Sequence, residues 1–129
     1  MRRFSALIGV ALLSSAFMAG GSMAGEADVV NVEVFKLKKS GDTMFRFKVT
    51  VAHADEGWDH YADAWELFGP DGASLARRVL LHPHVDEQPF TRSVDADIPK
   101  SVTVVTVRAH DKVHGWGGVE MQVDVPHDD

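Results

Sequence analysis

Apolar and polar residues alternate along several stretches of the chain, and this alternation limits the possible fold more than any other feature. In residues 44–53, MFRFKVTVAH, every second side chain from Phe45 to Val51 is apolar. Residues 118–125, GVEMQVDV, repeat the pattern, and residues 102–111, VTVVTVRAHD, are rich in β-branched side chains. A period of two is that of a β-strand with one buried face. The sequence therefore predicts an all-β fold.

Turn signals divide the chain into seven such segments. KSGD at 39–42, GPDG at 69–72, DIPK at 97–100 and HGWGG at 114–118 each combine residues that favour turns. The strands predicted between these turns are 29–37, 44–53, 60–68, 74–81, 89–96, 102–110 and 118–125. Short strands at this spacing indicate a single antiparallel sandwich. The predicted core comprises Phe45, Phe47, Val49, Val51, Trp65, Leu67, Val105, Val107, Met121 and Val123.

The third predicted strand carries Trp65, at a place where immunoglobulin-type sandwiches often keep a buried tryptophan. In its size, its seven strands and this tryptophan, the stretch 28–126 resembles small bacterial immunoglobulin-like or fibronectin-III-like domains. The resemblance implies a seven-stranded immunoglobulin-like sandwich as the one domain of residues 25–129. It implies nothing about activity, because such sandwiches serve many functions.

Residues 1–24 have the pattern of a signal peptide. Arg2 and Arg3 precede the apolar run 6–13, which is too short to span a bilayer, and Ser22 and Ala24 supply the small residues that a signal peptidase requires. We expect cleavage after Ala24, and a periplasmic or secreted protein that consists of residues 25–129.

Charge and cysteine content exclude several classes of partner and site. The formal net charge is −6, and loss of Arg2 and Arg3 with the leader would take it to −8, since all 19 acidic residues follow position 24. Such a surface disfavours binding to nucleic acid or to an anionic membrane. The chain has no cysteine, which excludes thiolate zinc sites and iron–sulfur clusters and predicts no lipid anchor on this chain.

Six of the seven histidines fall in loops that the predicted topology places at one end of the sandwich. Successive antiparallel strands reverse direction, so the second, fourth and sixth connections meet at the same end. These connections and the strand ends beside them carry His53, His60, His82, His84, His110 and His114. We call this end the histidine pole.

The histidine pole predicts a site for Cu(II) or Zn(II), because neutral imidazole is a good ligand for both ions. In an extended segment residues i and i+2 point the same way, so His82 and His84 could bind one ion together. The predicted ligands are His53, His82, His84 and His110, with His60 or His114 as substitutes. Asp55, Asp86 and Asp111 are expected to accept the outer ring N–H of the ligands. The predicted function is that of an exported metal carrier or sensor.

Two other functions remain open at this level. The same loops could recognise another exported protein or a small polar ligand through Trp58 and Trp116, with the histidines only bracing the loops. Alternatively, the pole could have a purely structural role. Enzymatic activity is not expected, because the four serines after residue 24 lie away from the histidines and no nucleophile motif is present.

Overall fold

The computed structural model describes residues 25–127, which form two antiparallel β-sheets and no α-helix within that range. The predicted signal peptide, residues 1–24, lies outside the described residues. The strands are β2 Asp28–Lys36, β3 Met44–Ala52, β4 Ala62–Phe68, β5 Ser74–Val79, β6 Phe90–Asp97, β7 Val104–Asp111 and β8 Met121–Asp124, with a short 3-10 turn, η3, at Lys38–Ser40. The prediction of an all-β chain with seven strands is confirmed, with strand ends shifted by no more than three residues.

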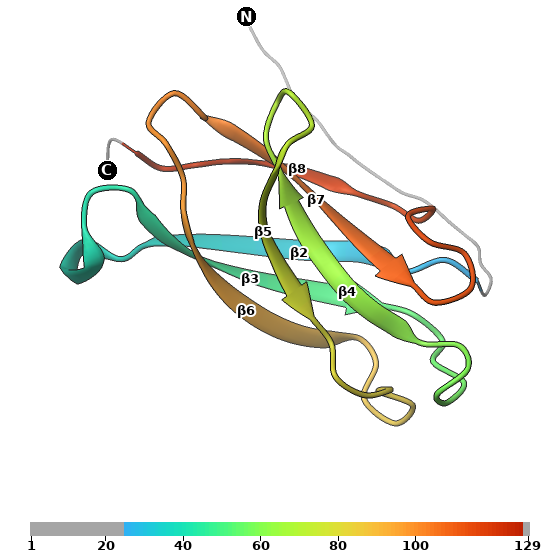
Figure 1. Cartoon of the computed structure of the whole chain (residues 1–129). Helices are drawn as coiled ribbons and strands as arrows, with labels where there is room; N and C mark the ends of the chain where they lie inside the picture. The colour runs from blue at the N-terminus through green and yellow to red at the C-terminus, as the bar shows by residue number, and fades with distance from the viewer. Residues whose placement is uncertain (1–24, 128–129) are drawn as a thin grey trace, which may run out of the picture.

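The strands are divided between a three-stranded sheet, in the order β2-β3-β6, and a four-stranded sheet, in the order β5-β4-β7-β8. Figure 1 shows the two sheets as stacked layers. β5 pairs with β4, so that Ala64 lies opposite Val79. β5 is the fourth strand of this chain, and it belongs to the sheet that contains the third strand, β4. In a constant-type immunoglobulin domain the fourth strand instead joins the sheet of the first two strands. In the described part of the chain, no helix is long and apolar enough to cross a membrane.

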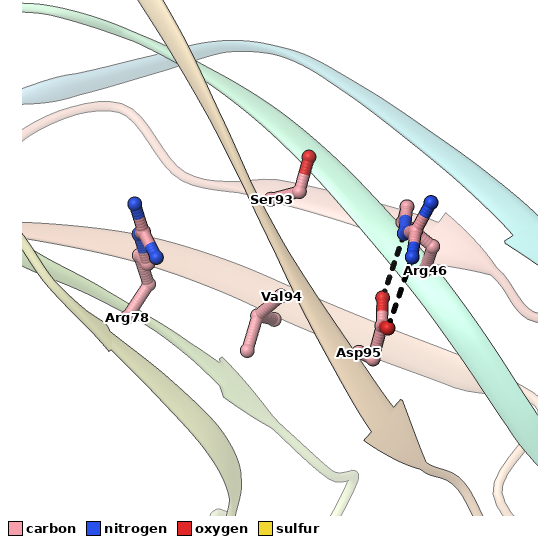
Figure 2. Close-up of a pocket in the computed structure, with 5 residues that line it drawn as sticks. All are labelled: Arg46, Arg78, Ser93, Val94 and Asp95. Carbon is pink, nitrogen blue, oxygen red and sulfur yellow. Dashed lines mark hydrogen bonds and ion pairs between the residues drawn. The ribbon is translucent and has the colours of Figure 1, made fainter.

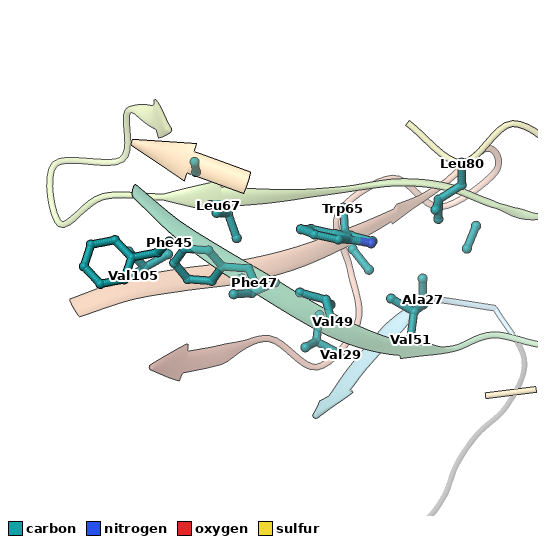
Figure 3. Close-up of a cluster of buried hydrophobic side chains, with 14 of the residues drawn as sticks. Ala27, Val29, Phe45, Phe47, Val49, Val51, Trp65, Leu67, Leu80 and Val105 are labelled. Carbon is teal, nitrogen blue, oxygen red and sulfur yellow. The ribbon is translucent and has the colours of Figure 1, made fainter. Parts of the chain in front are cut away.

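The core lies between the two sheets and is built from the alternating faces of the inner strands. Figure 3 shows Phe45 and Phe47 toward one end of the sandwich, Trp65 in the middle, and Ala27, Val51 and Leu80 toward the other end. The eight predicted core residues of β3, β4 and β7 are fully buried. Met121 and Val123, also predicted as core, are only partly buried because β8 is an edge strand that packs against the core from one side.

The three histidine-bearing connections do meet at one end of the sandwich. They are residues 53–61 between β3 and β4, 80–89 between β5 and β6, and 112–120 between β7 and β8, at the right of Figure 1. The register agrees with this view, since the last residue of β7, Asp111, lies opposite the first residue of β4, Ala62. The segment 25–27, which leads into β2, lies at the same end (Figure 1).

A shallow groove lies along the side of the sandwich, away from the histidine pole. Its lining residues are Arg46, Arg78, Ser93, Val94 and Asp95, drawn in Figure 2. Arg46 already has a partner, because its Nε and a terminal nitrogen lie 2.8 and 3.1 Å from the two carboxylate oxygens of Asp95. No histidine lines this groove.

Candidate metal centre

Asp111 is the buried anchor of the pole. It ends β7 with 0% of its surface exposed. Its Oδ1 accepts the backbone N–H groups of Val113 (2.7 Å) and His114 (2.6 Å), the side-chain-to-backbone bonding by which aspartate fixes a tight turn. Gly115 closes the turn with a φ of 70°, a left-handed conformation that favours glycine. The sequence HDKVHG therefore folds so that a buried carboxylate faces the interior of the pole.

His53 lies next to Asp111 and is held between two carboxylates. It continues the inward face of β3, as the alternation predicts, and is 5% exposed. Its Nδ1 lies 2.5 Å from Asp55 Oδ1, and its Nε2 lies 3.3 Å from Asp111 Oδ2. Asp55 is fixed in turn by the backbone N–H groups of Ala62 (3.1 Å) and His84 (2.7 Å). Asp55 thus orients the imidazole so that Nε2 faces Asp111.

His60 and His114 complete a cluster around Asp111. The Nε2 of His60 lies 3.6 Å from Asp111 Oδ1, while its Nδ1 is bound to Glu56 at 2.8 Å. The Nδ1 of His114 lies 3.2 Å from Asp111 Oδ2. The ring centroids of His53 and His60 are 4.8 Å apart, and those of His60 and His114 are 5.1 Å apart.

The spacing within this cluster is close to that of a metal site. One ligand atom each from His53, His60 and Asp111 can be chosen so that all three lie within 4.8 Å of one another. Ligand atoms at 2.0–2.2 Å from a tetrahedral zinc ion lie about 3.4 Å apart. Asp111 Oδ2 lies 3.3 Å from Nε2 of His53, and Asp111 Oδ1 lies 3.6 Å from Nε2 of His60, so each imidazole is near that distance from one of the two carboxylate oxygens. These three residues could therefore hold an ion after only small side-chain movements.

The electrostatics of the cluster favour a cation. Burial alone would raise the pKa of Asp55 and Asp111, but the hydrogen bonds that they accept lower the pKa of both carboxyls below the usual range. Two buried carboxylates therefore flank His53, and a buried charge is costly unless a counter-charge is close. Burial would lower the pKa of His53, but the bonds to Asp55 and to the Gly25 carbonyl and the nearby acids raise it. In the metal-free protein, a proton on His53 supplies the positive charge that balances the two carboxylates. A metal ion bound at the same place could supply this charge instead of the proton.

The HPH stretch forms a separate group on the other side of Asp55. The ring centroids of His82 and His84 lie 4.7 Å apart, as expected for residues i and i+2 of an extended segment. His84 is 5% exposed and stacks on Phe90 with centroids 4.0 Å apart. Both of its ring nitrogens are buried without a hydrogen-bond partner. His82 is exposed, and its Nδ1 lies 3.1 Å from the Pro83 carbonyl.

The remaining candidates lie apart from both groups. His110 is paired with Asp63 (2.6 Å) and packs against Trp116, with centroids 4.8 Å apart. Asp86 and Trp58 are exposed, Trp58 to 63%. The structure therefore brings together His53, His60, His114 and Asp111, but divides the predicted set of His53, His82, His84 and His110 among three places.

Sequence reasoning missed the part played by the segment before β2. The carbonyl oxygen of Gly25 lies 3.0 Å from His53 Nε2 and 3.3 Å from His60 Nε2. Gly117 and Gly118 make room for the segment, because a Cβ on either would overlap Glu26 or Ala27. The GG pair after Trp116 is a possible signal, but the sequence by itself indicates only a turn there. Nothing in residues 25–27 themselves indicates contact with a loop more than 80 positions away.

Comparison with known proteins yields one curated relative. A protein of Halomicrobium mukohataei named "Putative lipoprotein" is 46% identical over 99 residues, which are 77% of this chain and 47% of that protein. The chain therefore spans about half the length of this relative. No protein-family model and no solved structure matches the chain.

Proposed function

We propose that the histidine pole binds one divalent transition-metal ion, Zn(II) or Cu(II), through His53, His60 and Asp111, with His114 as an additional ligand, in a non-enzymatic carrier or sensor. The observation that carries the proposal is the group of two imidazoles and one buried carboxylate within 4.8 Å. The three residues come from the start and the end of the β3–β4 connection and from the end of β7. An ion would therefore fasten two loops of the pole to each other.

An exported location is part of this proposal. The leader-like pattern of residues 1–24 and the name of the Halomicrobium mukohataei relative, "Putative lipoprotein", both support export. The immunoglobulin-like or fibronectin-III-like identity of the sandwich also stays a prediction. In either case the strands form a scaffold from which the loops present the ligands, as is common for binding sites on β-sandwiches.

Metal titration of chelator-stripped protein tests the proposal. Calorimetry should show saturable uptake near one equivalent of Zn(II) or Cu(II). Fe(II) belongs in the same series, because two histidines and one carboxylate also form iron sites. His60→Gln should abolish the uptake, since it removes a ligand whose side chain is partly exposed and is therefore not needed for the core.

His110→Gln is the matched control, because His110 is also paired with an aspartate but lies outside the cluster. Uptake that survives in His60→Gln and is lost in the double variant His82→Ala/His84→Ala would move the site to the HPH stretch. Absence of saturable uptake in the wild-type protein would refute metal binding.

The second candidate is a metal-independent binding module, and exposed apolar side chains on the same loops favour it. Trp58, Leu81, Val85 and Val113 are all more than half exposed. Trp58 and Tyr61 form a T-shaped pair with centroids 5.7 Å apart, and the 63% exposure of Trp58 leaves much of the indole accessible to another exported protein. Loss of a partner contact in metal-free Trp58→Ala protein would favour this function over metal binding.

A further inference from the structure

The segment that precedes β2 is packed firmly into the histidine pole. Ala27 is fully buried. The backbone N–H of Val29 donates to the Val119 carbonyl (2.8 Å), and the N–H of Val119 donates to Asp28 Oδ1 (2.7 Å). Together with the missing side chains at Gly117 and Gly118, these bonds hold residues 25–28 against the β7–β8 connection.

This packing places Gly25 among the imidazoles of the candidate site. Its carbonyl oxygen is within 3.3 Å of the Nε2 atoms of both His53 and His60. A Cβ on Gly25 would lie 3.3 Å from Cε1 of His114, so that ring lies beside Gly25. Gly25 thus adjoins three of the four side chains in the proposed site.

Gly25 is also the residue that cleavage after Ala24 would place at the amino terminus. We propose that the freed α-amino group of Gly25, together with its carbonyl oxygen, completes the metal site; this rests on the proposed function. The amino nitrogen and the carbonyl oxygen of one residue lie about 2.7 Å apart when they are on the same side, so both can bind one ion in a five-membered ring. In the uncleaved chain the same nitrogen is a planar amide, whose lone pair is delocalised and does not bind a metal in its neutral form.

The expected donor set of the processed protein is the imidazoles of His53 and His60, the carboxylate of Asp111, the amine and the carbonyl oxygen of Gly25, and His114 as an additional ligand. Removal of the leader then has a chemical consequence beyond release of the protein. The precursor offers the ion the same side chains and the carbonyl oxygen, but no amine. One additional residue before Gly25 would move the amine by about 3.8 Å, well beyond a Zn–N bond of about 2.0 Å.

Two exported forms of the chain test the proposal. One carries its own leader, and the other has a threonine inserted after Ala24, so that the processed protein begins Thr-Gly25. Mass spectrometry of each purified protein establishes the amino terminus. Titration with Zn(II) alone should then give a Kd at least about 10-fold higher for the extended form, because even outer-shell groups contribute about 10–100-fold to metal affinity.

A spectroscopic measurement distinguishes ligation from a general structural effect. In Cu(II)-loaded protein that begins at Gly25, labelling of glycine with ¹⁵N should change the nitrogen hyperfine pattern of the copper EPR signal. The same label should have no effect in the extended form. Equal melting temperatures of the two metal-free forms would show that the insertion leaves the fold intact. If the melting temperatures differ, the EPR comparison decides whether the amine binds the metal.

The outcomes separate this inference from the proposed function. Equal Zn(II) affinities of the two forms, with binding lost in His60→Gln, would overturn ligation by the amine and leave the metal site standing. An amino terminus found at a position other than Gly25 would overturn it as well. No uptake of metal by either form would refute the proposed function, and the inference with it.

Discussion

Asp55 shows how one buried residue connects the folding of the pole to its chemistry. Its carboxylate lies 2.5 Å from Nδ1 of His53 and accepts backbone bonds from Ala62, at the start of β4, and from His84, in the β5–β6 connection. A carboxylate in this position fixes which imidazole nitrogen is free for a metal ion. Asp55 is thus both a brace between two loops and an orienting group for His53.

Asp55→Asn should weaken the protein and the site together. We expect the free energy of unfolding to fall by about 1–3 kcal/mol, because the amide cannot accept all three bonds as the carboxylate does. The Kd for Zn(II) should rise by about 10–100-fold. Denaturant unfolding and calorimetric titration measure the two effects. Asp63→Asn, which alters the partly exposed His110–Asp63 pair, should leave metal affinity unchanged, and equal losses in both variants would contradict the role of Asp55.

His84 should make the metal-free protein less stable in mild acid. Burial first, and then the positive charges of Arg92 and His82, lower the pKa of His84 in the folded state. The unfolded chain takes up this proton near pH 6.5. The contribution of the neutral His84 ring to the free energy of unfolding is therefore fully present above about pH 6.5. It is lost as the pH falls from there toward the folded-state pKa. His53 and His60, whose pKa values are raised, act in the opposite sense, so only a variant isolates the effect of His84.

His84→Phe is that variant, since phenylalanine keeps the stacking on Phe90 and does not titrate. Between pH 7.5 and 5.5 the unfolding free energy of the wild type should fall more steeply than that of His84→Phe. The slope of the unfolding free energy against pH is proportional to the number of protons taken up on unfolding, and His84 accounts for at most one. The two slopes should therefore differ by at most about 1.4 kcal/mol per pH unit. Urea unfolding at several pH values, in the presence of chelator, measures it. Parallel curves for the two proteins would show that the buried ring does not titrate as described.

At the level of elements, the β7–β8 connection determines where the chain before β2 lies. Gly118→Ala should disturb this contact, because the new Cβ would overlap the Ala27 carbonyl. We expect a loss of about 1–3 kcal/mol from overpacking. The amide of Val29, which donates to Val119, should also exchange its hydrogen faster. Gly72→Ala, in a turn at the opposite end with free space around it, serves as a control: it should cost stability through its positive φ without faster exchange at Val29.

The strands were predictable from the sequence because each one buries a single face. The alternation in β3 predicted its buried residues and placed His53 inward, and the reversal of successive strands predicted which connections meet. Phe90 and Ile98, both fully buried, are not in the predicted core because Phe90 is the first residue of β6 and Ile98 follows its last residue, where the alternation is interrupted. The pattern of a strand is local, and it weakens where the strand ends.

The composition of the site was less predictable than its location. His60 lies in a loop, whose residues have no fixed period, so the sequence could not show that it turns toward Asp111. His110 lies in β7 on the face opposite to that of Asp111, and it pairs with Asp63 of β4. His60 depends on the path of residues 54–61, where Gly57 has a φ of 111°. The contact with Gly25 depends on two glycines about 90 positions away. Such contacts follow from tertiary packing and not from local sequence.

At the scale of the whole molecule, a metal ion at the pole should stabilise the fold as a whole. The proposed ligands His53 and His60 lie at the two ends of one connection and Asp111 lies at the end of β7, so the ion would join the two sheets beyond the last core residues. The described residues contain no disulfide that could do the same.

Free metal at 100 times its Kd should add about 2.7 kcal/mol to the free energy of unfolding. This corresponds to a rise of roughly 10–20 °C in melting temperature for a domain of this size. The shift should grow with free Zn(II), and it should vanish in His60→Gln but persist in His82→Ala, whose exposed ring lies outside the cluster. If calorimetry records uptake but the melting temperature stays constant or falls, the ion binds the unfolded chain at least as well as the folded one. Scattered histidines would bind an ion in this way. A site assembled by the fold would bind it only in the folded protein and would raise the melting temperature.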